Sequence, residues 1–125
     1  MRTLEQEFAG TIYSQVANYV SAHPNEDDPD RKKYGAMANK LPILVCTAGL
    51  VQALAFVESR GEAPHKDLLA HLAQVAGNAS KDDFLAQSRQ ADLQGYIYLT
   101  RRTMLALKWY KRFAQSILKV EPGGE

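Results

Sequence analysis

Basic side chains are concentrated in one stretch near the end of the chain. Between Tyr96 and Lys119 there are six lysines and arginines and neither aspartate nor glutamate. If this stretch is a helix, with about 100° of rotation per residue, four of the cations share one face. We call this set the basic ridge: Arg101, Lys108, Arg112 and Lys119. At about 1.5 Å per residue the ridge is roughly 27 Å long, which matches roughly eight phosphates of a nucleic-acid strand. The ridge could bind a phosphate backbone; the alternative is a solvated helix face that happens to be basic.

Three large side chains lie beside the ridge, away from the apolar side of the same helix: Tyr98, Leu105 and Trp109. Arg102 and Arg112 flank Trp109. Large apolar groups on a helix face that should be solvent-exposed indicate a binding partner. This partner would be either a nucleic-acid base that stacks on them or a groove on another protein. The alternative is that a second helix of this chain covers them. A further basic group, Arg31, Lys32, Lys33 and Lys40, follows four acids and is predicted to be part of a mixed solvated surface.

Motifs for catalysis are missing from the sequence. There is no GxGxxG, no GxxxxGK[ST] and no GxSxG, so the common phosphate-binding loops and the nucleophile elbow are absent. We therefore predict that the protein is not an enzyme and needs no cofactor.

Metal-binding patterns are weak. Asp67 and His71 are one helical turn apart, a spacing that suits either a metal or an exposed salt-linked pair, and we favour the pair. Cys46 and His65 would complete a site only if the fold brought them close, and His23 and His65 are both predicted to lie at the surface. Asp27, Asp28 and Asp30 lack the glycine and distal glutamate of an EF-hand, so we expect them to be solvated. No metal site is predicted.

Composition indicates one globular domain. The chain has 125 residues, 46% hydrophobic residues and a net charge of +1. Residues 1–62 carry six basic and eight acidic side chains, whereas residues 63–125 carry nine and six, so positive charge is placed in the second half. The single cysteine, Cys46, lies in an apolar run and is expected to be a buried thiol. The N-terminus has no signal-peptide pattern, which favours the cytoplasm.

Hydrophobic periodicity predicts helices throughout. A first helix follows the Thr3–Gln6 capping box, Tyr34–Asn39 form a short helix or turn, and an apolar segment runs from about Leu41 to Arg60 as a new helix or a kinked continuation. Leu41–Val57 is short for a membrane span and contains Gln52, so we expect it to be the buried central helix of a bundle. Asp30 is a candidate cap for the helix after it, and Ser80 and Asp92 are candidate caps for the last two helices.

The last helix should have a broad apolar arc facing the core: Leu93, Tyr96, Ile97, Leu99, Met104, Ala106, Leu107, Tyr110, Phe113, Ala114, Ile117 and Leu118. The predicted fold is an all-α, single-domain bundle of five or six helices around the buried segment from Leu41 to Arg60, with a long basic C-terminal helix. The domain should cover residues 1–120, and residues 121–125 should be a frayed tail.

Two segments resemble the small helical subunit of the type III-B CRISPR effector, the Cmr RNA-silencing complex. The first, YGAMANKLPILVCTAGLVQALAFVESRG, contains Lys40-Leu41-Pro42, Gly49-Leu50 and Ala55-Phe56. The second, YLTRRTMLALKWYKRFAQSILK, contains Leu99-Thr100 and the run of Trp109, Lys111, Arg112, Phe113 and Ala114. The resemblance covers most of the chain but not Asn78–Gln94.

This resemblance implies a non-enzymatic subunit of an antiviral ribonucleoprotein. Several copies would stack along the guide RNA filament beside the larger backbone subunits and help hold guide and target RNA by their phosphates. The residues that fit this role are Arg101, Lys108, Arg112 and Lys119, with Lys40, Arg102 and Lys111 as second choices. A competing hypothesis is a protein-only scaffold that docks partner subunits through Tyr98, Leu105 and Trp109 without touching RNA. Leu41, Pro42, Gly49, Leu50 and Phe56 are expected to shape the core, with Gly49 allowing a close helix approach.

Overall fold

The computed structural model describes residues 1–122, which form six α-helices and no strand. The helices are α1 (Leu4–Ala22), α2 (Pro29–Ala48), α3 (Leu50–Arg60), α4 (Ala63–Val75), α5 (Lys81–Gln90) and α6 (Leu93–Ser116). The predicted all-α fold is therefore confirmed. Residues 123–125 of the predicted tail lie outside the described residues.

Side-chain caps set most of the helix starts. Thr3 and Gln6 form the predicted capping box at α1, Ser80 Oγ accepts from Asp83 N at α5, and Asp92 accepts from Gly95 N at α6. The prediction for α2 was wrong: Asp28, not Asp30, is its N-cap. Pro29 takes the first helical position, where its missing N–H costs nothing, and this moves the cap one residue before the proline.

The predicted central helix is divided between two elements. α2 continues through Pro42 and ends at Gly49, whose φ of +88° only glycine adopts readily, and α3 begins directly after it. The Tyr96 hydroxyl of α6 accepts a hydrogen bond from Val51 N at 3.2 Å and holds this break against α6. Gly49 thus lets the chain turn from α2 into α3. A Cβ at Gly49 would lie 3.3 Å from the Tyr96 hydroxyl, so the expected close approach of a neighbouring helix is also present. Within the described residues no helix is both long and apolar enough to cross a membrane.

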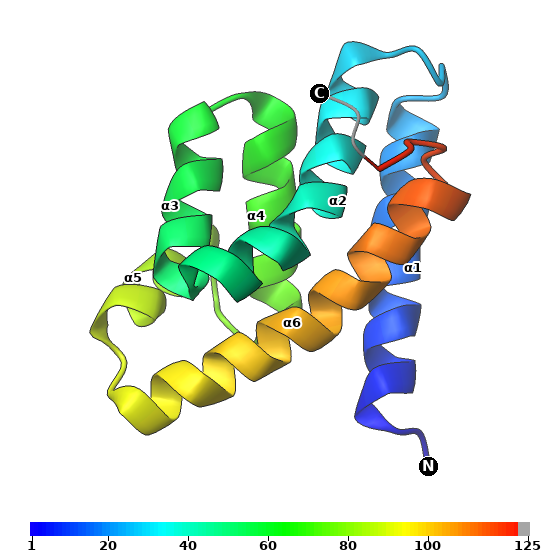
Figure 1. Ribbon diagram of the computed structural model, residues 1–125. Coiled ribbons are helices and arrows are strands. Elements are labelled where there is room, and N and C mark those ends of the chain that lie inside the picture. Colours follow the sequence, from blue (N-terminus) through cyan, green and yellow to red (C-terminus); the bar gives the residue numbers. More distant parts are fainter. Residues whose placement is uncertain (123–125) are drawn as a thin grey trace.

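The core lies between α2 and the helices around it. Figure 1 shows the long α6 running across α1 and α2, with α3, α4 and α5 on the other side of α2. All six helices contribute to the core, and α2 packs most extensively against α6. The largest fully buried side chains are Tyr34, Tyr110, Phe84, Ile12, Leu41, Leu50, Leu54, Leu68, Leu69, Leu72, Leu107 and Leu118. Of the expected core residues Leu41 and Leu50 are buried and Phe56 is half-buried.

Several surface and core predictions are corrected by this packing. Ile43 is 61% exposed and Cys46 is exposed, because this part of α2 shows one side to solvent rather than being buried all round. Arg31 was expected in a solvated group but is buried. His65 was expected at the surface but is buried in the first turn of α4, and His23 is half-buried.

Candidate nucleic-acid interface

The helix α6 is oriented by its apolar face. Leu99, Thr103, Ala106, Leu107, Tyr110 and Ala114 are buried against the rest of the bundle, so the opposite face is left to solvent. Most of the predicted apolar arc is buried or half-buried. Leu93 and Ile97 are the exceptions, at 73% and 41% exposed. The first turns of α6 lie beside α5, away from α1 (Figure 1), so fewer helices cover them.

The basic ridge is present but shorter than predicted. Arg101, Lys108 and Arg112 are all exposed on the solvent side of α6. Lys119 does not belong to the ridge, because α6 ends at Ser116 and Lys119 lies beyond it with a φ of +63°. The helical part from Arg101 to Arg112 is roughly 16 Å long, which matches roughly five phosphates.

One ridge cation already has an acidic partner. Lys108 Nζ forms an ion pair with Glu5 of α1, and it also lies 5.9 Å from the centroid of the Trp109 ring. Both side chains of the ion pair are about half exposed, so water screens this attraction and the pair can open. Arg101 and Arg112 are therefore the ridge residues more available to an outside anion.

A hollow lies between α2 and α6 next to the ridge. Its volume is about 530 Å³, and it is lined by Pro42, Met104, Lys108, Lys111, Arg112 and Gln115. Three of these six side chains are cations, and Lys111 is half-buried at the rim. Lys111, a second-choice residue in the sequence analysis, is thus brought together with Lys108 and Arg112. Cations grouped around a hollow of this size suit a phosphate group.

The other two second-choice residues lie elsewhere. Arg102 is half-buried and turned toward α1, with its guanidinium carbon 4.9 Å from the centroid of the Phe8 ring. Lys40 lies over Phe56 of α3, with Nζ 5.9 Å from the ring centroid. The structure does not bring either side chain into the basic ridge.

The predicted aromatic patch is divided. Tyr98 is 65% exposed, whereas Leu105 and Trp109 are half-buried and pack against the core. The rings of Trp109 and Phe113 have centroids 5.6 Å apart, and Phe113 meets Tyr13 of α1 edge-on at 5.6 Å. Phe113 therefore joins α6 to α1, and Trp109 packs beside it on the core, which supports the alternative that this chain covers Trp109. Sequence reasoning missed Tyr13, which is 54% exposed at the edge of this cluster.

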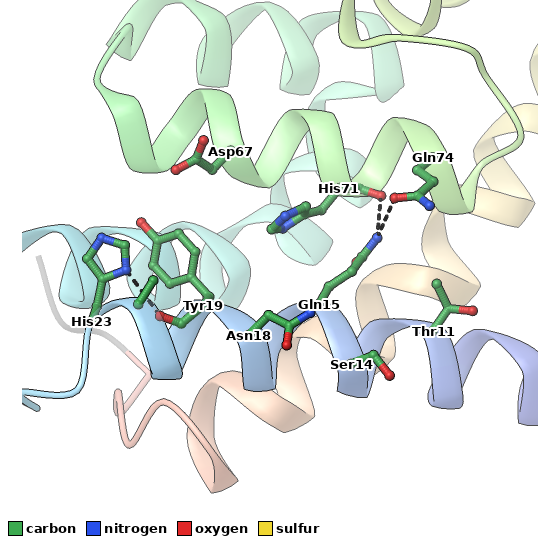
Figure 2. Close-up of a pocket in the computed structure, with 10 residues that line it drawn as sticks. Thr11, Ser14, Gln15, Asn18, Tyr19, His23, Asp67, His71 and Gln74 are labelled. Carbon is green, nitrogen blue, oxygen red and sulfur yellow. Dashed lines mark hydrogen bonds between the residues drawn. The ribbon is translucent and has the colours of Figure 1, made fainter.

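Asp67 and His71 line a polar groove of about 690 Å³ between α1 and α4 (Figure 2). The favoured interpretation, an exposed salt-linked pair, is wrong for His71. Its ring is half-buried, and Nδ1 lies 2.8 Å from the Tyr34 hydroxyl. Burial lowers the pKa of His71, and the Asp67 charge opposes that shift only in part. His71 is thus a structural residue of the α1, α2 and α4 packing.

Comparison with known proteins identifies the family. The sequence matches the family described as "CRISPR-associated protein (Cas_Cmr5)" over residues 4–117. The chain belongs to the Cas_Cmr5 family. This confirms the resemblance to the small subunit of the Cmr complex that the two sequence segments indicated.

Relatives from one organism support the assignment to Cas_Cmr5 in sequence and in structure. The CRISPR system Cmr subunit Cmr5 of Thermus thermophilus is 42% identical over 119 residues, which is 95% of this chain and 99% of that protein. A crystal structure of a CRISPR-associated Cmr5 family protein from Thermus thermophilus superposes with a TM-score of 0.82 at 43% identity and covers 94% of this chain and 98% of the other. The match therefore includes α1 to α6.

Proposed function

We propose that this Cas_Cmr5 family protein is a non-catalytic subunit of a CRISPR Cmr effector complex and that it holds RNA through α6. Guide RNA, target RNA or both would lie with their phosphates along Arg101, Lys108, Lys111 and Arg112. Cleavage would belong to other subunits. The curated relative is named a Cmr subunit, which supports assembly with other Cmr subunits.

The observation that carries the RNA proposal is the grouping of cations around the hollow between α2 and α6. Lys111 and Arg112 are adjacent in sequence and both line it, and Arg101 continues the same helix face about three turns earlier. α6 carries no acid between its Asp92 cap and its end. Contacts of this kind position a nucleic acid without reading its bases, so we expect no sequence preference.

The test belongs in the assembled complex, where several copies act together. With Lys108 paired to Glu5, about three phosphate contacts per copy predict a slope near −2.1 in log affinity against log salt for a single strand. That corresponds to roughly 20-fold weaker binding between about 50 and about 200 mM salt. Charge reversal of Arg101 and Arg112 together should remove most of this slope.

The matched control is Lys66→Glu, which reverses an exposed lysine on α4 and adds the same negative charge per site. Nuclease protection of guide and target RNA should fall for the α6 variant and stay unchanged for the control. Unchanged protection in an intact complex that carries the α6 variant would reject the RNA proposal.

A protein-only scaffold remains the second candidate, because apolar side chains are exposed at the start of α6. Leu93, Ile97 and Tyr98 are 73%, 41% and 65% exposed. Exposed apolar groups this close together favour a protein partner, such as a neighbouring copy or the backbone subunit. In this case Tyr98→Ala would impair assembly, and reversal of Arg101 and Arg112 would leave both assembly and RNA protection intact.

A further inference from the structure

The connection between α1 and α2 brings three possible metal ligands together. His23 follows the last residue of α1, Asp28 is the N-cap of α2, and Asp30 lies in its first turn. One ligand atom from each residue lies within 4.8 Å of the others, and this is the only such group within residues 1–122. All three side chains are half-buried, so the group is not an ordinary solvated acidic loop.

The imidazole of His23 is held in an orientation that suits metal binding. Its Nδ1 lies 3.1 Å from the backbone carbonyl oxygen of Tyr19. A carbonyl oxygen can only accept, so Nδ1 carries the proton and Nε2 keeps a lone pair. In metal-binding histidines the ring nitrogen that does not bind the metal usually donates a hydrogen bond, often to a backbone carbonyl, and this orients the ring. The ring also stacks on Tyr19, with centroids 4.3 Å apart and planes 20° apart.

The Asp28 carboxylate is also held in place. Asp28 Oδ1 accepts from the backbone N–H groups of Asp30 at 2.8 Å and Arg31 at 3.4 Å, which leaves Oδ2 of Asp28 for another partner. Lys32 forms its ion pair with Asp27, at 3.6 Å, and not with Asp28 or Asp30. The nearby guanidinium of Arg31 donates to four backbone carbonyl oxygens.

A polar group without a partner, the Tyr19 hydroxyl, belongs to the residue whose ring stacks on His23. Tyr19 is only 6% exposed, and its Oη is buried without a hydrogen-bond partner in the described part of the chain. Figure 2 shows Tyr19 beside His23, with its hydroxyl directed to the side of the groove where Asp67 lies.

We propose that His23, Asp28 and Asp30 bind a divalent transition-metal ion. One imidazole nitrogen and two carboxylate oxygens suit Zn²⁺ and its neighbours in the first transition row better than Mg²⁺ or Ca²⁺, which take oxygen ligands. The ion would join the end of α1 to the start of α2. It would therefore stabilise the folded chain, and the gain would rise with the logarithm of the free-ion concentration above the dissociation constant.

Titration of the purified full chain with Zn²⁺ tests the proposal. Isothermal titration should show one ion per chain, and the same ion should raise the melting temperature. Asp30→Asn removes one ligand charge without touching the Asp28 cap, and His23→Gln removes the imidazole; each should weaken Zn²⁺ binding by about tenfold or more. Circular dichroism of each variant without metal shows that it is folded.

Two controls exclude other zinc ligands. Asp67→Asn alters the neighbouring Asp67 and His71 pair, and Cys46→Ser removes the exposed thiol; both variants should bind one ion as tightly as the original chain. The proposal is overturned if folded Asp30→Asn and His23→Gln bind Zn²⁺ as the original chain does, if either control loses the ion, or if Mg²⁺ at equal concentration displaces it.

Discussion

Arg31 and Leu118 are 87 positions apart in the chain, yet Nε of Arg31 donates a hydrogen bond to the Leu118 carbonyl oxygen at 3.1 Å. The same buried guanidinium donates to the carbonyl oxygens of Ile117, His23 and Pro24. One side chain thus connects the end of α1, the start of α2 and the segment that follows α6. Its N–H groups donate to four carbonyl oxygens that have no hydrogen bond within a helix.

We predict that Arg31→Met destabilises the protein by about 2–4 kcal/mol, because buried carbonyl groups lose their donors. Methionine has similar length and cannot donate. Urea unfolding measures the change, and Lys32→Met, whose side chain is 56% exposed, is the control with an expected effect within about 0.5 kcal/mol. Equal urea midpoints for the two variants would show that the Arg31 hydrogen bonds contribute little.

Removal of the acid beside Lys108 should strengthen RNA binding if the proposed interface is correct. Glu5→Gln leaves Lys108 without its ion-pair partner, so one more cation becomes available for a phosphate. RNA affinity of the assembled complex should rise, and the salt slope should steepen by about 0.7 per copy. Stability should change by less than about 1 kcal/mol, since the pair is exposed. The control is Glu7→Gln, which removes another exposed acid of α1. It should raise RNA affinity less than Glu5→Gln does.

Substitution of Trp109 should lower the stability of the chain, whereas substitution of Tyr98 should impair assembly and leave stability unchanged. Trp109→Ala leaves a gap where the indole packs on the core beside Phe113, so it should destabilise the isolated chain by about 3 kcal/mol. Tyr98 is largely exposed, and Tyr98→Ala should leave the unfolding midpoint nearly unchanged while impairing contact with a partner subunit. Thermal unfolding and complex reconstitution separate the two effects. A stable Trp109→Ala chain would argue that Trp109 serves a ligand rather than the core.

The free energy of unfolding should fall as the pH decreases through the range in which histidine side chains titrate, and His71 should contribute to this fall. Burial lowers its pKa from the ordinary value of 6.5, so below pH 6.5 the unfolded chain takes up a proton that the folded chain resists. The contribution of His71 is complete above pH 6.5 and is lost as the pH approaches the folded pKa. Unfolding measured between about pH 7.5 and about pH 5.5 should show a weaker pH dependence for His71→Gln. His23→Gln is the comparison variant and should keep the His71 contribution.

The periodic features of the sequence were sufficient to predict the helices. The Thr3–Gln6 capping box, the Ser80 and Asp92 caps and the apolar face of α6 are all local patterns, and each is confirmed. The division at Gly49 was not predicted, because Leu41–Val57 is apolar on both sides of that glycine. The backbone of Gly49 and the tertiary contact between Tyr96 and Val51 show where the chain turns.

The candidate site could be predicted in part. Helical spacing alone placed Arg101, Lys108 and Arg112 on one exposed face. It could not show that Glu5 pairs with Lys108 or that Phe113 contacts Tyr13, since both facts depend on where α1 docks. The same limit applies to Arg31, which sequence placed among solvated cations because its four acceptors come from two distant segments.

The contact between Arg31 and the segment after α6 also bears on the order of events during synthesis. α1 and α2 are synthesised first, but the acceptors at Ile117 and Leu118 lie 86 and 87 positions after Arg31. The guanidinium therefore stays hydrated, and its pocket incomplete, until the segment after α6 has been made. The N-terminal half cannot complete its native packing before α6 and that segment have been synthesised.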